Sequence, residues 1–302
     1  MNNATTEKFS GDLKDDAMLN VMKENPVAVK SPNKNVRVLC WILTTRTNFY
    51  TRTIHVNNTW ARRCTKYLFF ATFGNDSTID LPIYYMKIPE GRQHLTKKTM
   101  VAFRFIYKKF INDFDWFLKA DDDTYVIVEN LQYFLQDKNP NDPVFFGQHF
   151  TRPWSGVLKN SLFKSGQGYF SGGAGYVISR ESLQRLGEKG EDPYLCKQDG
   201  LIEDYDFSRC LQNLGVALGK SADSLGRNRF NCFTPEIHLT GKMPPWYKSI
   251  EANGAKSGKA AISGDAISFH YVEGRVMYLL DLLLYHVRSP QNSNVTKKAT
   301  GT

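Results

Sequence analysis

The chain has 302 residues and a formal net charge of +9, and its 41% hydrophobic and 23% charged residues are typical of a soluble globular protein with a sizeable core. The basic residues are scattered, and the sequence shows neither zinc-finger spacing nor an RRM-type aromatic motif, so nucleic acid is not expected as a partner. A small ligand that carries phosphate explains part of the positive charge equally well.

The amino-terminal part of the chain alternates between predicted strands and helices. Residues 1–35 are polar and lack sustained periodicity, which predicts a flexible stem, and neither a signal peptide nor a membrane-spanning segment is visible in them. Short apolar runs rich in β-forming residues predict strands, and segments with apolar residues near a helical period predict helices. In chain order these are a strand in VRVLCWILTT (36–45), a helix in RTIHVNNTWARRC (52–64) with Ile54 and Trp60 turned inward, strands in KYLFFATFG (66–74) and LPIYYMKI (81–88), a helix in TKKTMVAFRFIYKKFI (96–111) and a strand in DWFLKA (115–120).

The carboxyl-terminal part carries further motifs. The segment YFSGGAGYVIS (169–179) places three glycines around Ala174, which indicates either a close approach of the backbone to a ligand or a plain tight turn. LIEDYDFSRCLQNLG (201–215) predicts a helix with carboxylates at its start, and DAISFHYV (265–272) predicts a strand. VMYLLDLLLYHV (276–287) is an apolar helix that is too short and too interrupted to span a membrane, so it is expected in the core or against a partner.

Strands that alternate with helices predict an α/β fold with a mostly parallel sheet, in which ligands bind beyond the carboxyl ends of the strands. Three consecutive aspartates, Asp121, Asp122 and Asp123, directly follow the predicted strand DWFLKA. Neighbouring carboxylates repel one another unless a divalent cation binds among them, and oxygen ligands suit Mg²⁺ or Mn²⁺. The triplet therefore predicts a metal site that can bind a diphosphate.

Two other groups of residues have both a chemical and an ordinary interpretation. His270, in SFHYV, is on its own more typical of a structural histidine. Glu203 and Asp204 could supply the general base for an inverting sugar transfer, but acidic residues are also common in the first turn of a helix because they complement the helix dipole. Spacing alone leaves both alternatives open.

The cysteines and glycosylation motifs give weaker indications. The chain has five cysteines and no CxxC pair, so a structural zinc site is not expected, and four of them could form two disulfides. Sequons at Asn3, Asn57, Asn75 and Asn294 permit N-glycosylation, which would favour the secretory pathway. The amino-terminal sequence leaves the compartment open.

Taken together, the motifs resemble a known family. The matching segments occur in family order over residues 36–288: VRVLCWILTT, HVNNTWARRC, EGRQHLTKKTMVAF, DWFLKADDDTYVIVENL, YFSGGAGYVIS, IEDYDFSRC, PEIHLTGKMP and SFHYV. They are similar to the core 1 β1,3-galactosyltransferases, which are inverting β1,3-glycosyltransferases of the GT-A fold. The resemblance implies a GT-A (Rossmann-like) α/β fold with a mixed, mostly parallel central sheet, a catalytic domain over 36–288 and a flexible tail over 289–302.

The resemblance also implies an activity and its residues. The family transfers galactose from UDP-galactose to the 3-hydroxyl of O-linked GalNAc on glycoproteins with inversion, and it depends on Mn²⁺. Carried over to this sequence, the metal ligands are Asp121, Asp123 and His270, and the base region is Asp204 with Glu203 beside it. The implied donor-binding residues are Leu43, Thr44, Arg92, Lys98, Asp121, Asp122 and Tyr271, and the implied acceptor-binding residues are Trp246 and Tyr247.

Further implications concern disulfides, assembly and location. The resemblance implies disulfides Cys40–Cys64 and Cys196–Cys210, is compatible with a homodimer, and places the family in the Golgi lumen as type II membrane proteins, although no anchor is visible in this chain. The sequence also departs from the family: the aromatic run that follows Trp246 is replaced by YKSIEANGAKSGKAAISGD, and an adjacent cysteine pair is missing, which leaves Cys232 without its partner. Two alternatives therefore stay open, namely a β1,3-transferase with another donor or acceptor, and a non-catalytic binder or chaperone-like homologue.

Overall fold

The computed structural model describes residues 36–72, 80–151 and 168–287. The stem predicted over 1–35, the tail predicted over 289–302 and the sequons at Asn3, Asn75 and Asn294 lie outside these residues. The remaining sequon lies inside the fold, because Asn57 is only 3% exposed and its side chain accepts a hydrogen bond from the Tyr67 hydroxyl. A surface glycan is therefore not expected at Asn57.

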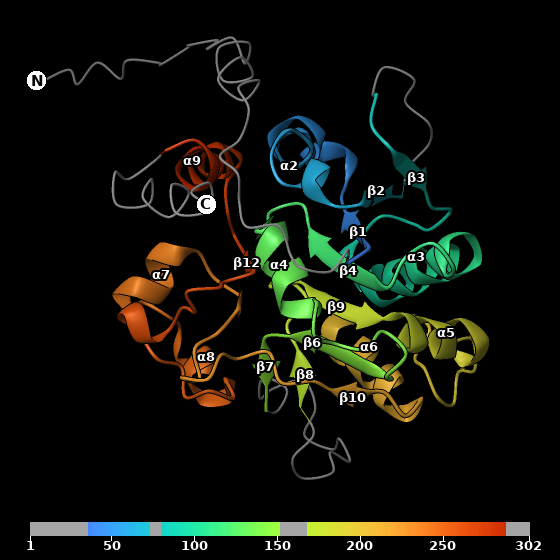
Figure 1. Cartoon of the computed structure of the whole chain (residues 1–302). Coiled ribbons are helices and arrows are strands. Elements are labelled where there is room, and N and C mark those ends of the chain that lie inside the picture. Colours follow the sequence, from blue (N-terminus) through green and yellow to red (C-terminus); the bar gives the residue numbers. More distant parts are fainter. Residues whose placement is uncertain (1–35, 73–79, 152–167, 288–302) are drawn as a thin grey trace, which may run out of the picture.

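A seven-stranded sheet forms the centre of the molecule (Figure 1). Strand β9 runs antiparallel to both of its neighbours, and the other neighbouring pairs are parallel, which confirms the predicted mixed, mostly parallel sheet. The spatial order is β10-β6-β9-β4-β1-β2-β3, with bounds β1 Val38–Leu43, β2 Lys66–Ala71, β3 Ile83–Tyr85, β4 Trp116–Asp121, β6 Val144–Gly147, β9 Tyr176–Ser179 and β10 Ala217–Leu218.

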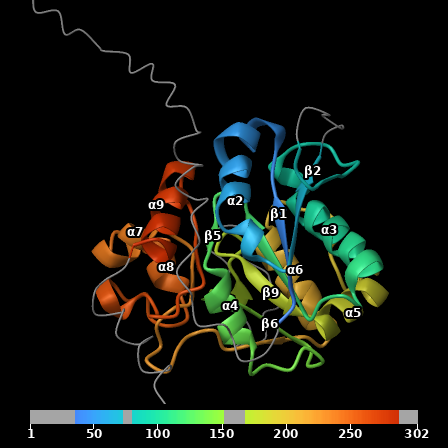
Figure 2. The ribbon, with the colours of Figure 1, turned by 45° about the horizontal axis from the view of Figure 1, so that its top comes forward.

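Both faces of the sheet are buried, which explains why its central strands are almost entirely apolar. Successive side chains of a strand point to opposite faces, so Cys40 and Ile42 belong to one hydrophobic core and Leu39 and Trp41 to the other. Helices α3 (Leu95–Phe110), α5 (Arg180–Lys189) and α6 (Glu203–Asn213) cover the second core. On the other side lie α2 (Ile54–Asn58), α4 (Val128–Leu135), α7 (Pro235–Thr240), α8 (Pro245–Ile250) and α9 (Gly274–Tyr285) (Figures 1 and 2).

Two small sheets complete the fold beside the central one. The first joins β11 (Phe230–Asn231), β12 (Ser268–Phe269) and β5 (Tyr125–Val126), and it holds the segment after β4 against the carboxyl-terminal part of the chain. The second pairs β7 (His149–Phe150) with β8 (Tyr169–Phe170). Short 3-10 and π turns cover Arg46–Asn48, Phe49–Thr53, Ala61–Arg63, Arg92–His94 and Gly258–Ala260.

Two predicted elements differ from the observed ones. The single helix expected over 52–64 is a succession of short turns around α2, which breaks at Thr59 (φ −112°, ψ −102°); Trp60 is buried as expected, whereas Ile54 is only half-buried. The strand expected over 265–272 is reduced to β12, because Tyr271 adopts a left-handed backbone with φ 58° that ends the extended conformation.

The disulfides and the last helix agree with expectation. Cys40–Cys64 and Cys196–Cys210 are both present, and Cys232 is free and buried. Helix α9 packs Met277 and Tyr278 inward and exposes Leu279 and Leu283. No helix in the described ranges combines the length and the apolar character needed to cross a membrane.

Candidate active site

A cleft of about 670 Å³ opens where β1 and β4 end. Leu43 and Asp121 are the last residues of these strands and lie opposite each other in the parallel register, so both strands deliver the residues that follow them to the same edge. The other walls are the glycine loop before β9, the first turn of α6, and the segment after β12. The site residues predicted from the sequence that line the cleft are Leu43, Thr44, Arg92, Lys98, Asp121, Asp122, Asp123, Glu203, Asp204, Trp246, His270 and Tyr271.

Three of these residues form a cluster suited to a metal ion. One ligand atom each of Asp121, Asp123 and His270 lies within 4.8 Å of the others. His270 Nε2 is 3.1 Å from Asp123 Oδ1 and 3.8 Å from Asp121 Oδ2. Two carboxylate oxygens and one imidazole nitrogen are a donor set that divalent first-row cations accept. The residues present therefore fit a divalent metal, with His270 beside the two aspartates.

The middle aspartate has a different role. Asp122 is 4% exposed, and its Oδ2 accepts hydrogen bonds from Thr44 Oγ1 at 2.8 Å and Asn48 Nδ2 at 2.9 Å. Burial raises the pKa of Asp122 to about 6, against the opposing effect of these hydrogen bonds. Asp122 thus links the end of β4 to the segment after β1. Thr44 lines the cleft and also donates one of the hydrogen bonds that make this link.

The glycine loop, residues 172–175, lies close against side chains of the cleft. A Cβ atom at Gly173 would lie 2.1 Å from His270 Cε1, and one at Gly172 would lie 2.7 Å from Glu203 Oε2. The next glycine, Gly175, has φ +77°, which a tight turn requires. The tight-turn interpretation therefore holds at Gly175, whereas Gly172 and Gly173 approach side chains of the cleft, so the loop joins the metal cluster to the start of α6.

The two carboxylates of α6 differ in their surroundings. Glu203 Oε1 accepts hydrogen bonds from Thr99 Oγ1 at 3.0 Å and from the Tyr176 hydroxyl at 2.7 Å, so this side chain is fixed. Asp204 is half-buried, and its Oδ2 accepts the backbone N–H of Gly172 at 3.3 Å. Burial raises the pKa of Asp204 above its usual range, as it does for Glu203. Asp204 is the more accessible of the two carboxylates.

Two basic residues of the cleft were missed by the sequence analysis. Lys119, on β4, is 2% exposed, and its ammonium donates to Asp121 Oδ1 at 2.5 Å and to the Gly172 carbonyl at 3.1 Å. Burial alone would lower the pKa of Lys119, but the carboxylates of Asp121 and Glu203 raise it to about 12. Arg52 Nη1 donates to Asp123 Oδ2 at 2.8 Å and to Asp122 Oδ1 at 3.3 Å. The position of Lys119 inside an apolar strand could have identified it as a site residue, whereas no sequence pattern identifies Arg52.

Aromatic and basic residues line the outer cleft. Tyr271 is 55% exposed and stacks on His270, with ring centroids 3.9 Å apart. Trp246 lines the cleft together with Phe233. Lys98 is nearly buried and pairs with Glu90 at 2.5 Å. The structure thus brings both an aromatic wall and cationic side chains to the predicted donor and acceptor regions.

Tyr247 is not part of this wall. It is 1% exposed, it does not line the cleft, and its hydroxyl accepts a hydrogen bond from Gln148 Nε2 at 2.6 Å. Trp246 and Tyr247 are neighbours on the short helix α8, so their side chains leave the helix in different directions. Of the two residues predicted to contact the acceptor, only Trp246 lines the cleft, so the prediction is kept for Trp246 and dropped for Tyr247.

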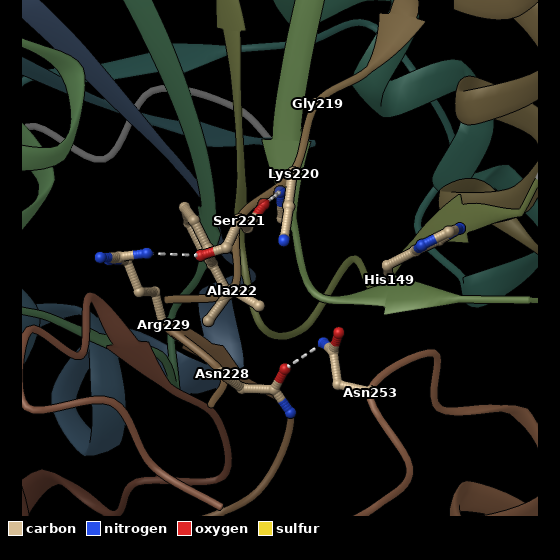
Figure 3. A pocket seen from close by; sticks show the side chains of 10 residues that line it. His149, Gly219, Lys220, Ser221, Ala222, Asn228, Arg229 and Asn253 are labelled. Atoms are coloured by element: carbon tan, nitrogen blue, oxygen red, sulfur yellow. Dashed lines mark hydrogen bonds between the residues drawn. The ribbon is translucent and has the colours of Figure 1, made fainter. Parts of the chain in front are cut away.

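A second pocket, of about 50 Å³, lies beside β7 (Figure 3). Its polar groups bind one another: the Arg229 side chain donates to the backbone carbonyl of Ser221 at 3.2 Å, and the Asn253 side chain donates to Asn228 Oδ1 at 2.7 Å. It contains no carboxylate among its lining residues. The large cleft is therefore the candidate site.

Comparison with known proteins shows which family the chain belongs to. Residues 34–224 match the model of the Fringe-like family. The chain is 41% identical over 261 residues to a glycoprotein-N-acetylgalactosamine 3-β-galactosyltransferase 1 of Xenopus laevis, which covers 85% of this chain and 68% of that protein. It is 25% identical over 185 residues to chondroitin sulfate synthase 3 of Mus musculus, covering 58% and 20% of the two chains.

A β-1,3-glucosyltransferase of Mus musculus is 26% identical over 167 residues, covering 55% of this chain and 31% of that protein. Among solved structures, the galactosyltransferase LgtC aligns over 84% of this chain and 98% of its own, with 13% identity and a TM-score of 0.44. The family match spans more than half of the chain, and the Xenopus relative is similar along most of it. The chain therefore belongs to the Fringe-like family, in the branch of the core 1 β1,3-galactosyltransferases.

Proposed function

We propose that this protein transfers galactose from UDP-galactose to the 3-hydroxyl of O-linked GalNAc on glycoproteins, with inversion at the sugar. The observation that carries the proposal is the convergence on one cleft of a metal-binding cluster and a raised-pKa carboxylate, Asp204. The name of the Xenopus relative supports the choice of donor sugar and acceptor.

Asp121, Asp123 and His270 would hold the divalent cation, for which we propose Mn²⁺, since an imidazole among oxygen ligands favours it over Ca²⁺. When bound, the cation neutralises charge on the departing diphosphate. Arg92 adds positive charge to the cleft wall, where Lys98 is paired with Glu90. We assign donor binding to these residues together with Leu43, Thr44, Asp122 and Tyr271.

Asp204 is the proposed general base. Its carboxylate is oriented by the Gly172 N–H, and burial raises its pKa, which makes it a stronger acceptor for the proton of the sugar hydroxyl. Glu203 is held by Thr99 and Tyr176 and supports the shape of the site. Trp246 offers an aromatic face to the apolar side of the acceptor sugar.

The proposal includes a cellular setting. Two disulfides suit an oxidising compartment, and we infer the Golgi lumen from the relative's class of enzyme. We treat residues 36–288 as one catalytic domain. The exposed leucines of α9 are compatible with a homodimer contact.

A panel of UDP-sugars and glycopeptide acceptors tests the proposal. UDP-galactose with a GalNAc-α-Thr peptide should give a β1,3-linked product, identified by NMR, and Asp123→Ala should abolish turnover while leaving the melting temperature unchanged. The replaced aromatic run after Trp246 favours one second candidate, a transferase with another acceptor, which would give product only with another member of the panel. Binding of UDP-galactose without product from any acceptor would instead indicate a non-catalytic homologue.

A further inference from the structure

Each aspartate of the metal cluster is held by a basic side chain through one of its two oxygens. Lys119 contacts Asp121 Oδ1 at 2.5 Å, and Arg52 contacts Asp123 Oδ2 at 2.8 Å. The other oxygens, Asp121 Oδ2 and Asp123 Oδ1, are those that lie 3.8 and 3.1 Å from His270 Nε2. One oxygen of each carboxylate is thus engaged by a cation of the protein, and the other faces the imidazole.

The two basic residues reach the cluster from independent elements. Lys119 precedes Asp121 by two residues on β4, so both side chains point to the same face of the sheet. Arg52 belongs to the turn Phe49–Thr53 that follows β1, and its side chain is 44% exposed. Two separate segments of the chain therefore each place a basic side chain against one oxygen of a metal-cluster aspartate.

The aspartate triplet and the two basic side chains that contact it have nearly balanced formal charges before any ligand binds. Three carboxylates, Asp121, Asp122 and Asp123, face two cations, Arg52 and Lys119, which leaves a formal charge of three minus two, or one negative, and Lys119 also lies 3.9 Å from Glu203 Oε2. A divalent cation would more than neutralise this cluster, and a nucleoside diphosphate would supply the missing negative charge.

We propose that Arg52 and Lys119 are positioning residues, which hold Asp121 and Asp123 as one-oxygen ligands and keep the affinity for a bare divalent cation low, so that cation and nucleoside diphosphate bind as a unit. This inference rests on the proposed function, since it assigns a donor diphosphate to the same site. Removal of either basic residue should strengthen binding of the bare cation more than binding of the cation to the nucleotide-loaded protein, so the nucleotide should enhance cation binding less, and the cation should enhance nucleotide binding less by the same factor.

Arg52→Met is the decisive variant, because a half-exposed side chain can be replaced without unfolding the protein. Free Mn²⁺ would be measured by electron paramagnetic resonance during titration of the full chain, with and without UDP. We expect bare Mn²⁺ to bind about tenfold more tightly than in the wild type, because a positive charge near the ion is removed. We also expect UDP to enhance Mn²⁺ binding less than in the wild type, and turnover to fall although the metal binds better.

The control is Arg62→Met, which removes an exposed arginine that does not line the cleft and should leave Mn²⁺ binding unchanged. Lys119→Met should also strengthen the binding of bare Mn²⁺. If this substitution of a buried residue prevents folding, the comparison of Arg52→Met with Arg62→Met still tests the proposal. A bare Mn²⁺ affinity that is unchanged or weaker in Arg52→Met, with weaker UDP binding, would overturn the proposal and make Arg52 a direct diphosphate ligand. If the wild type modifies no acceptor, the proposed function fails, but this binding comparison remains a test.

Discussion

A methyl group added at Gly173 gives a sharp test of the glycine loop. The Cβ of Gly173→Ala would lie 2.1 Å from His270 Cε1 and 2.3 Å from His270 Nδ1. Carbon atoms in contact are about 3.5–4.0 Å apart, so the imidazole would have to move by more than about 1 Å. Tyr271 stacks on the ring at 3.9 Å, and Gly173 itself is anchored by Thr124, whose hydroxyl donates to the Gly173 carbonyl at 2.8 Å.

The displacement should affect function more than stability. Overpacking of this kind costs about 1–3 kcal/mol of folding free energy. A misplacement of about 1 Å at a reacting centre lowers turnover by about 100-fold. Since His270 is a proposed metal ligand, we expect Gly173→Ala to weaken Mn²⁺ binding and to reduce turnover by at least about 100-fold, with a folded protein.

Gly264→Ala is the matched control, because no atom lies within 4 Å of the added Cβ and its backbone is not left-handed. Turnover would be followed by UDP release, Mn²⁺ affinity by titration and folding by thermal denaturation, for both variants in parallel. Wild-type Mn²⁺ affinity and turnover in a folded Gly173→Ala protein would refute the reasoning that this loop sets the position of His270.

Three further predictions follow from named contacts. Asp204→Asn should lower kcat by about 10²–10⁴-fold, while UDP binding, measured by calorimetry, is retained. Because burial raises the pKa of Asp204 and a base must be deprotonated, wild-type turnover should fall as the pH drops through a value above the usual aspartate range, which stopped-flow or endpoint assays at a series of pH values would locate. Arg63→Met should lower the free energy of unfolding by about 3 kcal/mol in urea titrations, because it removes the guanidinium paired with the 3%-exposed Asp281 side chain and leaves that carboxylate only the Tyr125 hydroxyl and His286; an unchanged midpoint would contradict this. Replacing Cys196 and Cys210 by alanine opens a crosslink with a sequence separation of 14 and should cost about 3 kcal/mol, seen as a lower urea midpoint than that of the wild type without reductant; equal midpoints would contradict this.

The placement of the aspartate triplet could be predicted from the sequence because it depends on local pattern. An apolar strand followed at once by carboxylates puts those carboxylates at the edge of a buried sheet, and the register of Leu43 with Asp121 shows that edge. The direction of β9 could not be predicted, because a strand buried on both faces has the same composition whether it is parallel or antiparallel.

Contacts that depend on tertiary packing could not be predicted from the sequence. Arg52 lies on an irregular turn, and only the fold shows that its side chain reaches Asp123. Of the adjacent aromatics, Trp246 and Tyr247, only one faces the cleft, and the choice is set by how the short helix α8 packs. Periodicity over six residues is too short to define a buried face.

The most direct test of the proposed function is release of UDP from UDP-galactose in the presence of Mn²⁺, with and without a GalNAc-α-Thr glycopeptide, by the wild type and by Asp123→Ala. The account predicts release that depends on the glycopeptide in the wild type and none in the variant. UDP-galactose that binds tightly, but is released as UDP at the same rate with and without the glycopeptide, would contradict the account.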